Sequence, residues 1–391
     1  MRKMNIMFDN KKALKVFRIL DREWRAQKDV FENIVLPQDR LKFSRDANFL
    51  FYAALFMRGG IISEDPFRWI CVLYDENPEY FDPNYIVDEG IEEADLQKAF
   101  LKITPKVLAQ NGHVYGRKEN GSGNPFAYKI DQHTKAWITN SYFLVDKWNG
   151  NILKVFKGVK DFEEAFARVN LKDKKRNGGH GILGMRRKIF SLLTIWLQEK
   201  NLIPHFPTPI PVDFHALRIL WITGILNLPD LKPFEINLDH PISYDGKIAV
   251  RMREDFVDEV TKWSQNFLHK SKISHLVINP ALWVLSRDLC SRHFQNSSAK
   301  EGTVLREPEK FYSGKISWPR MYTDPCSACP IEQYCHGVVP AAPYYIWGIL
   351  MKMDRVPFNL QPLQTQTVLP GLGFKEKHPV FARFKRRSEK K

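Results

Sequence analysis

Apolar residues recur at helical spacing through most of this chain. Residues 46–58 carry a broad apolar face that stops at a glycine pair, and residues 63–81 open with a serine and two acidic residues before a proline. Such features are typical of helix ends and helix starts. Helices are also predicted by the same spacing in four later runs: 138–148, 161–169, 188–200 and 215–226.

Residues 204–213, PHFPTPIPVD, interrupt this pattern with four prolines in ten residues. Proline removes a backbone donor and clashes with the preceding helical turn, so this segment cannot be helical. We expect it to be an extended crossing between two lobes. Strand-like alternation is weak along the chain, and no internal repeat is visible. The pattern therefore predicts an all-α fold of two helical lobes with a cleft between them.

Composition and net charge indicate the class of partner. Hydrophobic residues make up 44% of the chain and aromatic residues 13%, as in a folded globular protein. The formal net charge is +15 and the pI is about 9.4, which favours a polyanionic partner and above all nucleic acid. No apolar run is long enough for a bilayer, and the basic N-terminus lacks the apolar stretch of a signal peptide. We expect a cytoplasmic protein, associated with the nucleoid in a prokaryote, with no membrane partner.

Cysteines supply a candidate metal centre. Cys326, Cys329 and Cys335 form a C-x2-C-x5-C array within DPCSACPIEQYCHG. In the reducing cytoplasm such an array is typical of a metal site, which needs a fourth ligand. Cys71 lies on an apolar helical stripe and is interpreted as a core thiol. Cys290 ends an apolar helix and is the predicted fourth ligand, across an insertion at 291–325. The spacing alone leaves zinc and a [4Fe–4S] cluster both open.

Two segments before this array carry candidate chemistry. In GILGMRRKIFSLL (181–193), a glycine turn and three basic residues precede an amphipathic helix. Backbone N–H groups at such a turn form an anion-binding nest suited to a DNA phosphate. In PVDFHALRIL (211–220), Asp213 opens a helix and is interpreted as its N-cap, where the helix dipole favours a negative charge.

Taken together, these segments resemble the helix-hairpin-helix-GPD superfamily of endonuclease III-like DNA glycosylases. ILGMRRKIF is similar to the hairpin pattern L-P-G-V-G-x-K-T-A, and VDFHALR is similar to V-D-T-H-x-x-R. The last three cysteines keep the spacing of the family's cluster loop, and Trp283, Arg287 and Cys290 match its approach helix. The resemblance spans roughly residues 40–340, with specific motifs only at 181–220 and 283–335.

The sequence also departs from the family pattern. Leu183 stands where the hairpin has proline, and Arg186 stands where it has its second glycine. The separation between the lysine and the aspartate is longer here, and the insertion at 291–325 replaces six residues of the family's loop. The role of that insertion is left open.

The resemblance implies an enzyme that cleaves the N-glycosidic bond of a damaged or modified base in DNA. Asp213 takes the place of the catalytic aspartate. Lys188 takes the place of the lysine that attacks the sugar in bifunctional members, and a phosphate-binding role for Lys188 is equally open, so AP-lyase activity is undecided. The residues that the resemblance and the basic run assign to DNA contact are Gly184, Arg186, Arg187, His215 and Arg218.

A wedge residue must fill the gap left by a flipped base. The family places it in a loop that corresponds to Arg58, although a helix C-cap with a solvated side chain also fits that arginine. The cofactor implied is a [4Fe–4S] cluster, with Zn²⁺ as the alternative. The expected ligands are Cys290, Cys326, Cys329 and Cys335.

We therefore expect four regions in a monomer whose partner is DNA. The N-terminal segment 1–39 packs on the cluster lobe, 40–205 is a helical barrel lobe with the helix–hairpin–helix motif, 206–345 is the lobe with the catalytic aspartate and the cluster, and 346–391 is a basic tail. Two alternative functions remain: an N-glycosidic hydrolase acting on a modified nucleoside or nucleotide, and a non-catalytic iron–sulfur protein that binds nucleic acid.

Overall fold

The computed structural model divides the chain into two compact units. Unit 1 comprises Met1–Ile34 and Val212–Lys391, and unit 2 comprises Val35–Pro211. These divisions lie close to the expected lobe boundaries at 39/40 and 205/206. The structure describes residues 6–32, 34, 36, 46–57, 64–109, 130–170, 181–227, 246–290, 304–306, 320–322 and 329–335.

The described residues are mostly helical, and the strands among them are two or three residues long. The predicted all-α class is confirmed for this part of the chain. The sequence analysis missed two short antiparallel pairs, β1–β2 and β3–β4. The second pair lies within the insertion at 291–325.

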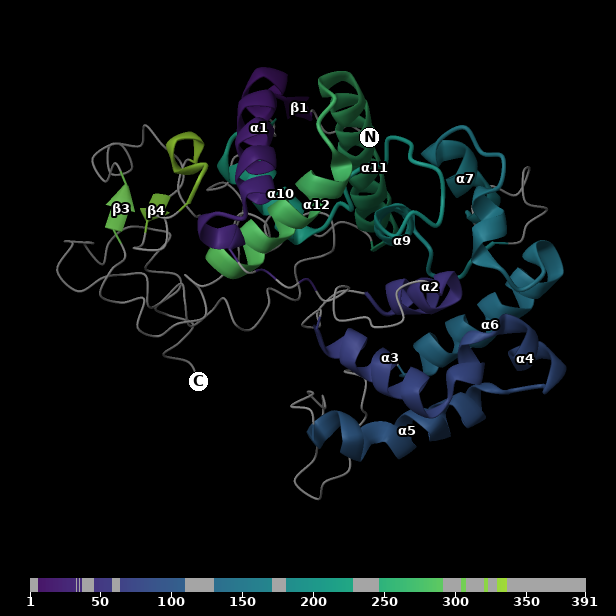
Figure 1. The fold of residues 1–391 in the computed structure, drawn as a ribbon. Coiled ribbons are helices and arrows are strands. Elements are labelled where there is room, and N and C mark those ends of the chain that lie inside the picture. Colours follow the sequence, from purple (N-terminus) through teal and green to yellow (C-terminus); the bar gives the residue numbers. More distant parts are fainter. Residues whose placement is uncertain are drawn as a thin grey trace. The chain divides into compact units, whose positions relative to one another are not determined.

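Unit 1 combines the N-terminal helix with helices that follow residue 212. Figure 1 shows α1 beside α12, and α12 also contacts α10. The elements of unit 1 are β1 (Met7–Phe8), α1 (Asn10–Ala26), η1 (Asp29–Phe31), α10 (Phe214–Ile222), β2 (Leu226–Asn227), α11 (Gly246–Ser271), α12 (His275–Val284), the π-helix η5 (Leu285–Cys290), β3 (Val304–Arg306), β4 (Arg320–Tyr322) and η7 (Glu332–Tyr334).

Trp263 of α11 fixes the N-terminal segment within unit 1. Its ring stacks on Phe8 with centroids 4.5 Å apart and meets Phe17 edge-on at 6.4 Å. The indole Nε1 donates a 2.8 Å hydrogen bond to Asn10 Oδ1. Phe8 also pairs with Leu226 in the β1–β2 ladder. Aromatic stacking and backbone pairing together hold the first helix against residues more than 200 positions away.

Unit 2 is formed by consecutive helices and short helical turns. Its elements are α2 (Ala47–Phe56), α3 (Glu64–Glu76), η3 (Pro78–Phe81), α4 (Pro83–Asp88), α5 (Glu93–Ala109), α6 (Ile130–Trp148), η4 (Ile152–Phe156), α7 (Phe162–Val169) and α9 (Arg187–Glu199).

Helix α2 lies at the centre of unit 2. Nine of its ten residues are buried, which is the pattern of a helix that is apolar on every face. Tyr52 stacks on Trp137 of α6 with ring centroids 4.1 Å apart. Its hydroxyl lies 2.6 Å from Ser141 Oγ, and burial raises the pKa of Tyr52 well above its usual value. The phenol therefore stays protonated and hydrogen-bonded inside the core.

The predicted helices are present, and two of them end sooner than the pattern indicated. The run at 63–81 is divided, because α3 ends at Glu76 and a proline follows two residues later. The run at 215–226 ends at Ile222, because Gly224 adopts a left-handed φ of 67° and closes the helix. The residues beyond Gly224 enter strand β2. The proline-rich crossing at 204–213 contains no helix, as predicted.

Replacing Gly150 by alanine is expected to destabilise unit 2. Gly150 has a φ of 70°, and a Cβ there would overlap the side chain of Asn84. Its carbonyl also accepts a 2.8 Å hydrogen bond from Asn48 Nδ2. Left-handed strain and this overlap together should lower the free energy of unfolding by about 3 kcal/mol, measured by urea titration.

Gly90 is the matched control for this substitution. It has a similar φ of 63°, and a Cβ there would meet nothing within 4 Å. Gly90→Ala should therefore show only the backbone cost of about 1–2 kcal/mol. Equal losses at both positions would mean that the Asn84 overlap carries no energy.

Candidate functional site

A tight turn precedes α9 in unit 2. Gly184 adopts a left-handed φ of 84°, and Arg186 N donates a 3.0 Å hydrogen bond to Gly184 O. Arg186 is the N-cap of α9 with φ −81° and ψ 168°, an extended conformation that any L-residue adopts. This backbone needs glycine at position 184 but not at position 186. The second departure from the hairpin pattern therefore causes no backbone strain.

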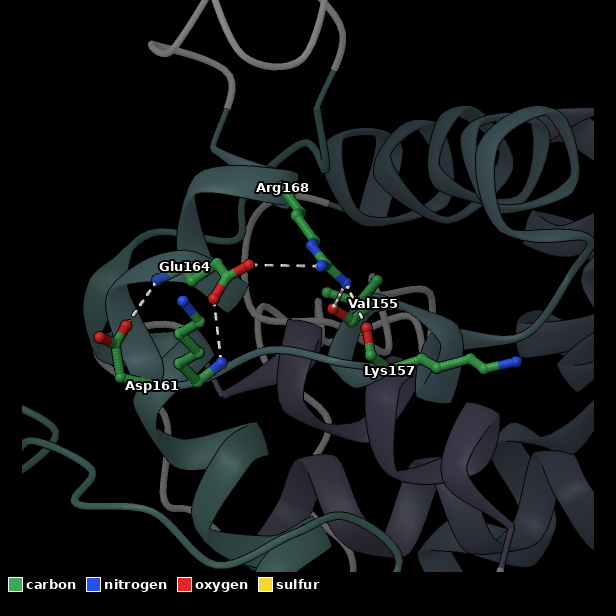
Figure 2. A network of polar contacts seen from close by, with 6 residues as sticks. Val155, Lys157, Asp161, Glu164 and Arg168 are labelled. Carbon is green, nitrogen blue, oxygen red and sulfur yellow. Dashed lines mark hydrogen bonds and ion pairs between the residues drawn. The ribbon is translucent and has the colours of Figure 1, made fainter.

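Helix α7 comes before this turn and is braced by Arg168. Figure 2 shows the Arg168 guanidinium donating two 2.9 Å hydrogen bonds, to the carbonyl oxygens of Val155 and Lys157. The same guanidinium forms an ion pair with Glu164 at 3.6 Å. Because two backbone carbonyls receive a charged donor, Arg168 ties α7 to the end of η4.

Arg187, the first residue of α9, is held by α7. Its Nη1 and Nη2 lie 2.5 Å and 2.8 Å from the two carboxylate oxygens of Glu163. Its guanidinium also lies 4.7 Å from the ring centroid of Phe166. The Arg187 side chain is only 17% exposed, whereas Arg186 is exposed. Both arginines were predicted to contact DNA, and they differ in exposure: Arg187 is half-buried against Glu163, while Arg186 is exposed.

Lys188 is the second residue of α9 and is half-buried. It lies in the same first turn as Arg187, directly after the Gly184 turn. The structure thus groups four predicted residues of unit 2 around one helix start: Gly184, Arg186, Arg187 and Lys188. Whether Lys188 acts as a nucleophile or binds phosphate stays a prediction.

Asp213 is the N-cap of α10 in unit 1, as its sequence context indicated. Its Oδ1 accepts hydrogen bonds from the N–H groups of His215 at 2.9 Å and Ala216 at 3.0 Å. The backbone carbonyl of Asp213 accepts from Leu217 N at 2.9 Å. The side chain is half-buried. Two backbone donors and the positive end of the helix dipole therefore fix one carboxylate oxygen at the start of α10.

His215 and Arg218 are buried, and both side chains contact Ser286. Arg218 is 3% exposed and donates from Nη1 to the Ser286 carbonyl at 3.0 Å and to Ser286 Oγ at 3.2 Å. His215 is 9% exposed, and its Nδ1 lies 3.1 Å from the same Oγ. Both residues were predicted to contact DNA. They join α10 to the π-helix η5 through Ser286, and a contact of either buried side chain with DNA stays a prediction.

The π-helix η5, which ends at Cys290, is therefore hydrogen-bonded through Ser286 to α10, the helix that Asp213 caps. Helix α12 continues without a break into η5, whose last residue is Cys290. π-Helical turns are rare and are frequent at functional sites. Ser286 lies within this turn and is fully buried. The described residues include the backbone of Cys290 but not its side chain.

Two of the predicted ligands lie at the ends of a short helical turn. Cys329 and Cys335 flank η7 and are half-buried. Cys329 O accepts from Glu332 N at 3.1 Å, and Cys335 N donates to Glu332 O at 3.0 Å. Ile331 between them is 1% exposed and anchors the turn in the protein. Thiols held on one compact turn fit a thiolate-ligated metal or iron–sulfur cluster by their chemistry.

The remaining parts of the predicted centre lie outside the described residues. Cys326 and Arg58 are among them. Within the described ranges, no group of three or more His, Cys, Asp or Glu residues could hold a metal ion. These ranges contain the side chains of only two of the four predicted ligands, so the ligand set stays a prediction.

Cys71 differs from the array in position and in chemistry. It lies on α3 in unit 2, whereas the predicted ligands belong to unit 1. Burial, with a smaller contribution from Asp75, raises the pKa of the Cys71 thiol to about 11. A thiol with this pKa is protonated at neutral pH, and the thiolate is the form that binds metals. These properties fit the interpretation of Cys71 as a structural thiol.

The sequence analysis missed three residues that build these two sites. Glu163 neutralises Arg187, Ser286 joins α10 to η5, and Asn140 of α6 binds the backbone of Leu183 in the turn. Their partners lie 24, 68 and 43 residues away in the sequence. For Glu163 the signal in the sequence is limited to its place among the acidic residues in the first turn of α7.

Comparisons with protein-family models, with curated proteins and with solved structures found no match to this chain. The resemblance to the glycosylase superfamily therefore rests on the motif residues themselves. Among the described residues, no helix combines the length and the apolar character that a membrane span requires.

Proposed function

We propose that this protein is a DNA N-glycosylase that removes a damaged or modified base. The observation that carries the proposal is the Asp213 carboxylate, bonded to two N–H groups at the start of α10 within the sequence VDFHALR. The resemblance gives this aspartate the catalytic role. The helix–hairpin–helix motif, the cluster loop and a role in base-excision repair belong to the same proposal.

Cleavage of an N-glycosidic bond builds positive charge on the sugar, as in glycoside hydrolysis. A carboxylate in a fixed position stabilises this charge without having to reorganise during the reaction. The hydrogen bonds from His215 N and Ala216 N hold Asp213 Oδ1 in place. Asp213 would thus act on the sugar cation directly or by activating the nucleophile that attacks it.

The role of Lys188 would decide whether strand cleavage follows the release of the base. As a neutral amine it would attack the sugar carbon, displace the base and leave a Schiff base that leads to strand cleavage. As a cation it would only bind phosphate, and water would be the nucleophile.

The positive net charge of the chain favours a polymeric anion, DNA, as the substrate. A net charge of +15 suits sequence-independent binding to phosphates, which weakens steeply with salt as counterions are released. The target base would be flipped out of the duplex, with Arg58 as the proposed wedge. A [4Fe–4S] cluster, held by Cys290, Cys326, Cys329 and Cys335, would crosslink their loop through iron–thiolate bonds.

Arg186→Gln is expected to weaken DNA binding more than Arg187→Gln. Arg186 is exposed at the start of α9, so its loss should reduce the slope of log K against log salt by about 0.9, the value for one phosphate. Arg187 is paired with Glu163, so its loss should mainly lower the free energy of unfolding, by about 1 kcal/mol. Fluorescence anisotropy and urea unfolding measure the two effects, and the opposite ranking in DNA affinity would contradict the structural assignment.

The function is tested by incubating the purified protein with duplexes that each carry one damaged or modified base. Base release followed by alkali-dependent nicking indicates a monofunctional glycosylase. Nicking without alkali, with an adduct trapped by borohydride, indicates the lyase reaction of Lys188. Release from free nucleosides or nucleotides but not from duplexes would favour the nucleotide hydrolase, and binding without release would favour the non-catalytic alternative.

A further inference from the structure

We propose that Asn140 is a positioning residue for the turn that presents the start of α9 to DNA. Asn140 lies within α6 and is completely buried. Its Oδ1 accepts from Leu183 N at 2.6 Å, and its Nδ2 donates to Leu183 O at 3.0 Å. One side-chain amide thus satisfies both backbone groups of a residue 43 positions away. The proposal rests on the proposed DNA-binding role of this turn.

The two hydrogen bonds with Asn140 fix the backbone directly before the Gly184 turn. Leu183 immediately precedes Gly184, whose left-handed backbone reverses the chain before α9. Fixing both the N–H and the C=O of Leu183 fixes its backbone on both sides. The direction in which the following N–H groups point is then set by α6 and not by the turn alone.

Helix α6 is a rigid support for this interaction. The residues on either side of Asn140 in the helical turn are part of the central core: Trp137 stacks on Tyr52, and Ser141 lies 2.6 Å from the Tyr52 hydroxyl. The segment before Leu183 is also fixed, because Ile182 N donates to the carbonyl of Val169 at 2.9 Å. The turn is therefore connected to the core of unit 2 at two adjacent residues.

This interaction explains why Leu183 can replace the proline of the hairpin pattern. Proline stiffens a turn by fixing its own φ, but it has no N–H to donate. Leu183 retains that N–H and donates it to Asn140 Oδ1. This is the shorter of the two hydrogen bonds between these residues. In this chain a side-chain amide from another helix takes over the stiffening that a proline ring provides in the family pattern.

The test compares Asn140→Ala with Ser141→Ala in the full-length chain. Both variants lose buried hydrogen bonds from the same helix, and both should unfold at lower urea concentration. Only Asn140→Ala should lower the affinity for a fluorescein-labelled duplex, by about tenfold on every sequence, with the salt slope reduced by about 0.9. A merely structural role for Asn140 predicts equal effects of the two variants on binding.

Leu183→Pro removes the same hydrogen bond from the other partner. Because a proline ring also stiffens the turn, Leu183→Pro should restore part of the lost affinity in the Asn140→Ala background, and in the wild-type background it should weaken binding less than Asn140→Ala does. If Asn140→Ala does not fold, Asn140→Leu carries the test, because it removes the same two hydrogen bonds and leaves a smaller cavity. Wild-type affinity and salt slope in the folded variants would overturn the role of Asn140 and leave the proposed function standing. A wild-type chain that binds no duplex would instead overturn both.

Discussion

The Asp213→Asn protein is expected to fold normally and to release base about 10²–10³ times more slowly than the wild type. Asparagine caps a helix about as well as aspartate, so the hydrogen bonds from His215 N and Ala216 N should persist. What is lost is the negative charge that would stabilise the sugar cation. Removing one electrostatic stabiliser of a transition state commonly costs this factor. Single-turnover base release and urea unfolding measure the two properties.

Asp9→Asn is the matched control. Asp9 is also an N-cap in unit 1, where its Oδ1 accepts from Lys12 N at 2.9 Å. The substitution changes the same group in the same structural position on a different helix, and full activity is expected. An Asp213→Asn protein that is folded and as active as Asp9→Asn would show that Asp213 serves only as a cap.

Cys335→Ala is expected to remove all the iron from the purified protein. The wild type should contain about four iron atoms per chain and absorb visible light through thiolate-to-iron charge transfer. Cys335 ends the η7 turn, and a cluster that loses one of its cysteine ligands should not persist through purification. Iron analysis and the visible spectrum measure the loss, and the same result is expected for Cys290→Ala.

Cys71→Ala is the control, because burial raises the pKa of that thiol to about 11 and favours its protonated form. The variant should keep the full iron content. About one zinc and no iron per wild-type chain would identify a zinc site in place of the cluster. Loss of iron in Cys71→Ala with full retention in Cys290→Ala would show that the fourth ligand was assigned wrongly.

The sequence predicted those features that depend on local chemistry. Helical spacing located the helices, and the proline content excluded helix at 204–213. The cap at Asp213 followed from an aspartate directly before an apolar helical run. The end of α10 was missed because the apolar pattern continues through Gly224 into residues that pair with the N-terminal strand. That pairing joins the N-terminal segment to residues more than 200 positions later, and the periodicity of apolar residues carries no information about it.

The roles of the charged residues depended on such distant contacts. Arg186 and Arg187 are indistinguishable in the sequence, yet the second is half-buried against Glu163 on another helix and the first is exposed. Arg218 was assigned to DNA by its place in VDFHALR, and its burial against Ser286 became visible only when the chain was folded. A basic residue in a motif therefore predicts a positive charge at that position. It leaves open whether that charge binds DNA or another group of the protein.

The departures from the hairpin pattern have a similar explanation. Leu183 and Arg186 stand where the family that the sequence resembles has proline and glycine. The extended backbone of Arg186 removes the need for a second glycine, and Asn140 supplies the constraint that proline would give. The first of these is a local backbone conformation, and the second is a tertiary contact with a residue 43 positions away.

The most direct test of the account is mass-spectrometric detection of the base released from a duplex that carries a single modified base. The wild-type protein should liberate the intact modified base and leave an abasic site in the strand, at one base per duplex under single-turnover conditions. The Asp213→Asn protein should bind the same duplex and release base 10²–10³ times more slowly. Wild-type protein that carries its cluster, binds each duplex of the panel and releases no base from any of them would contradict the proposed glycosylase activity.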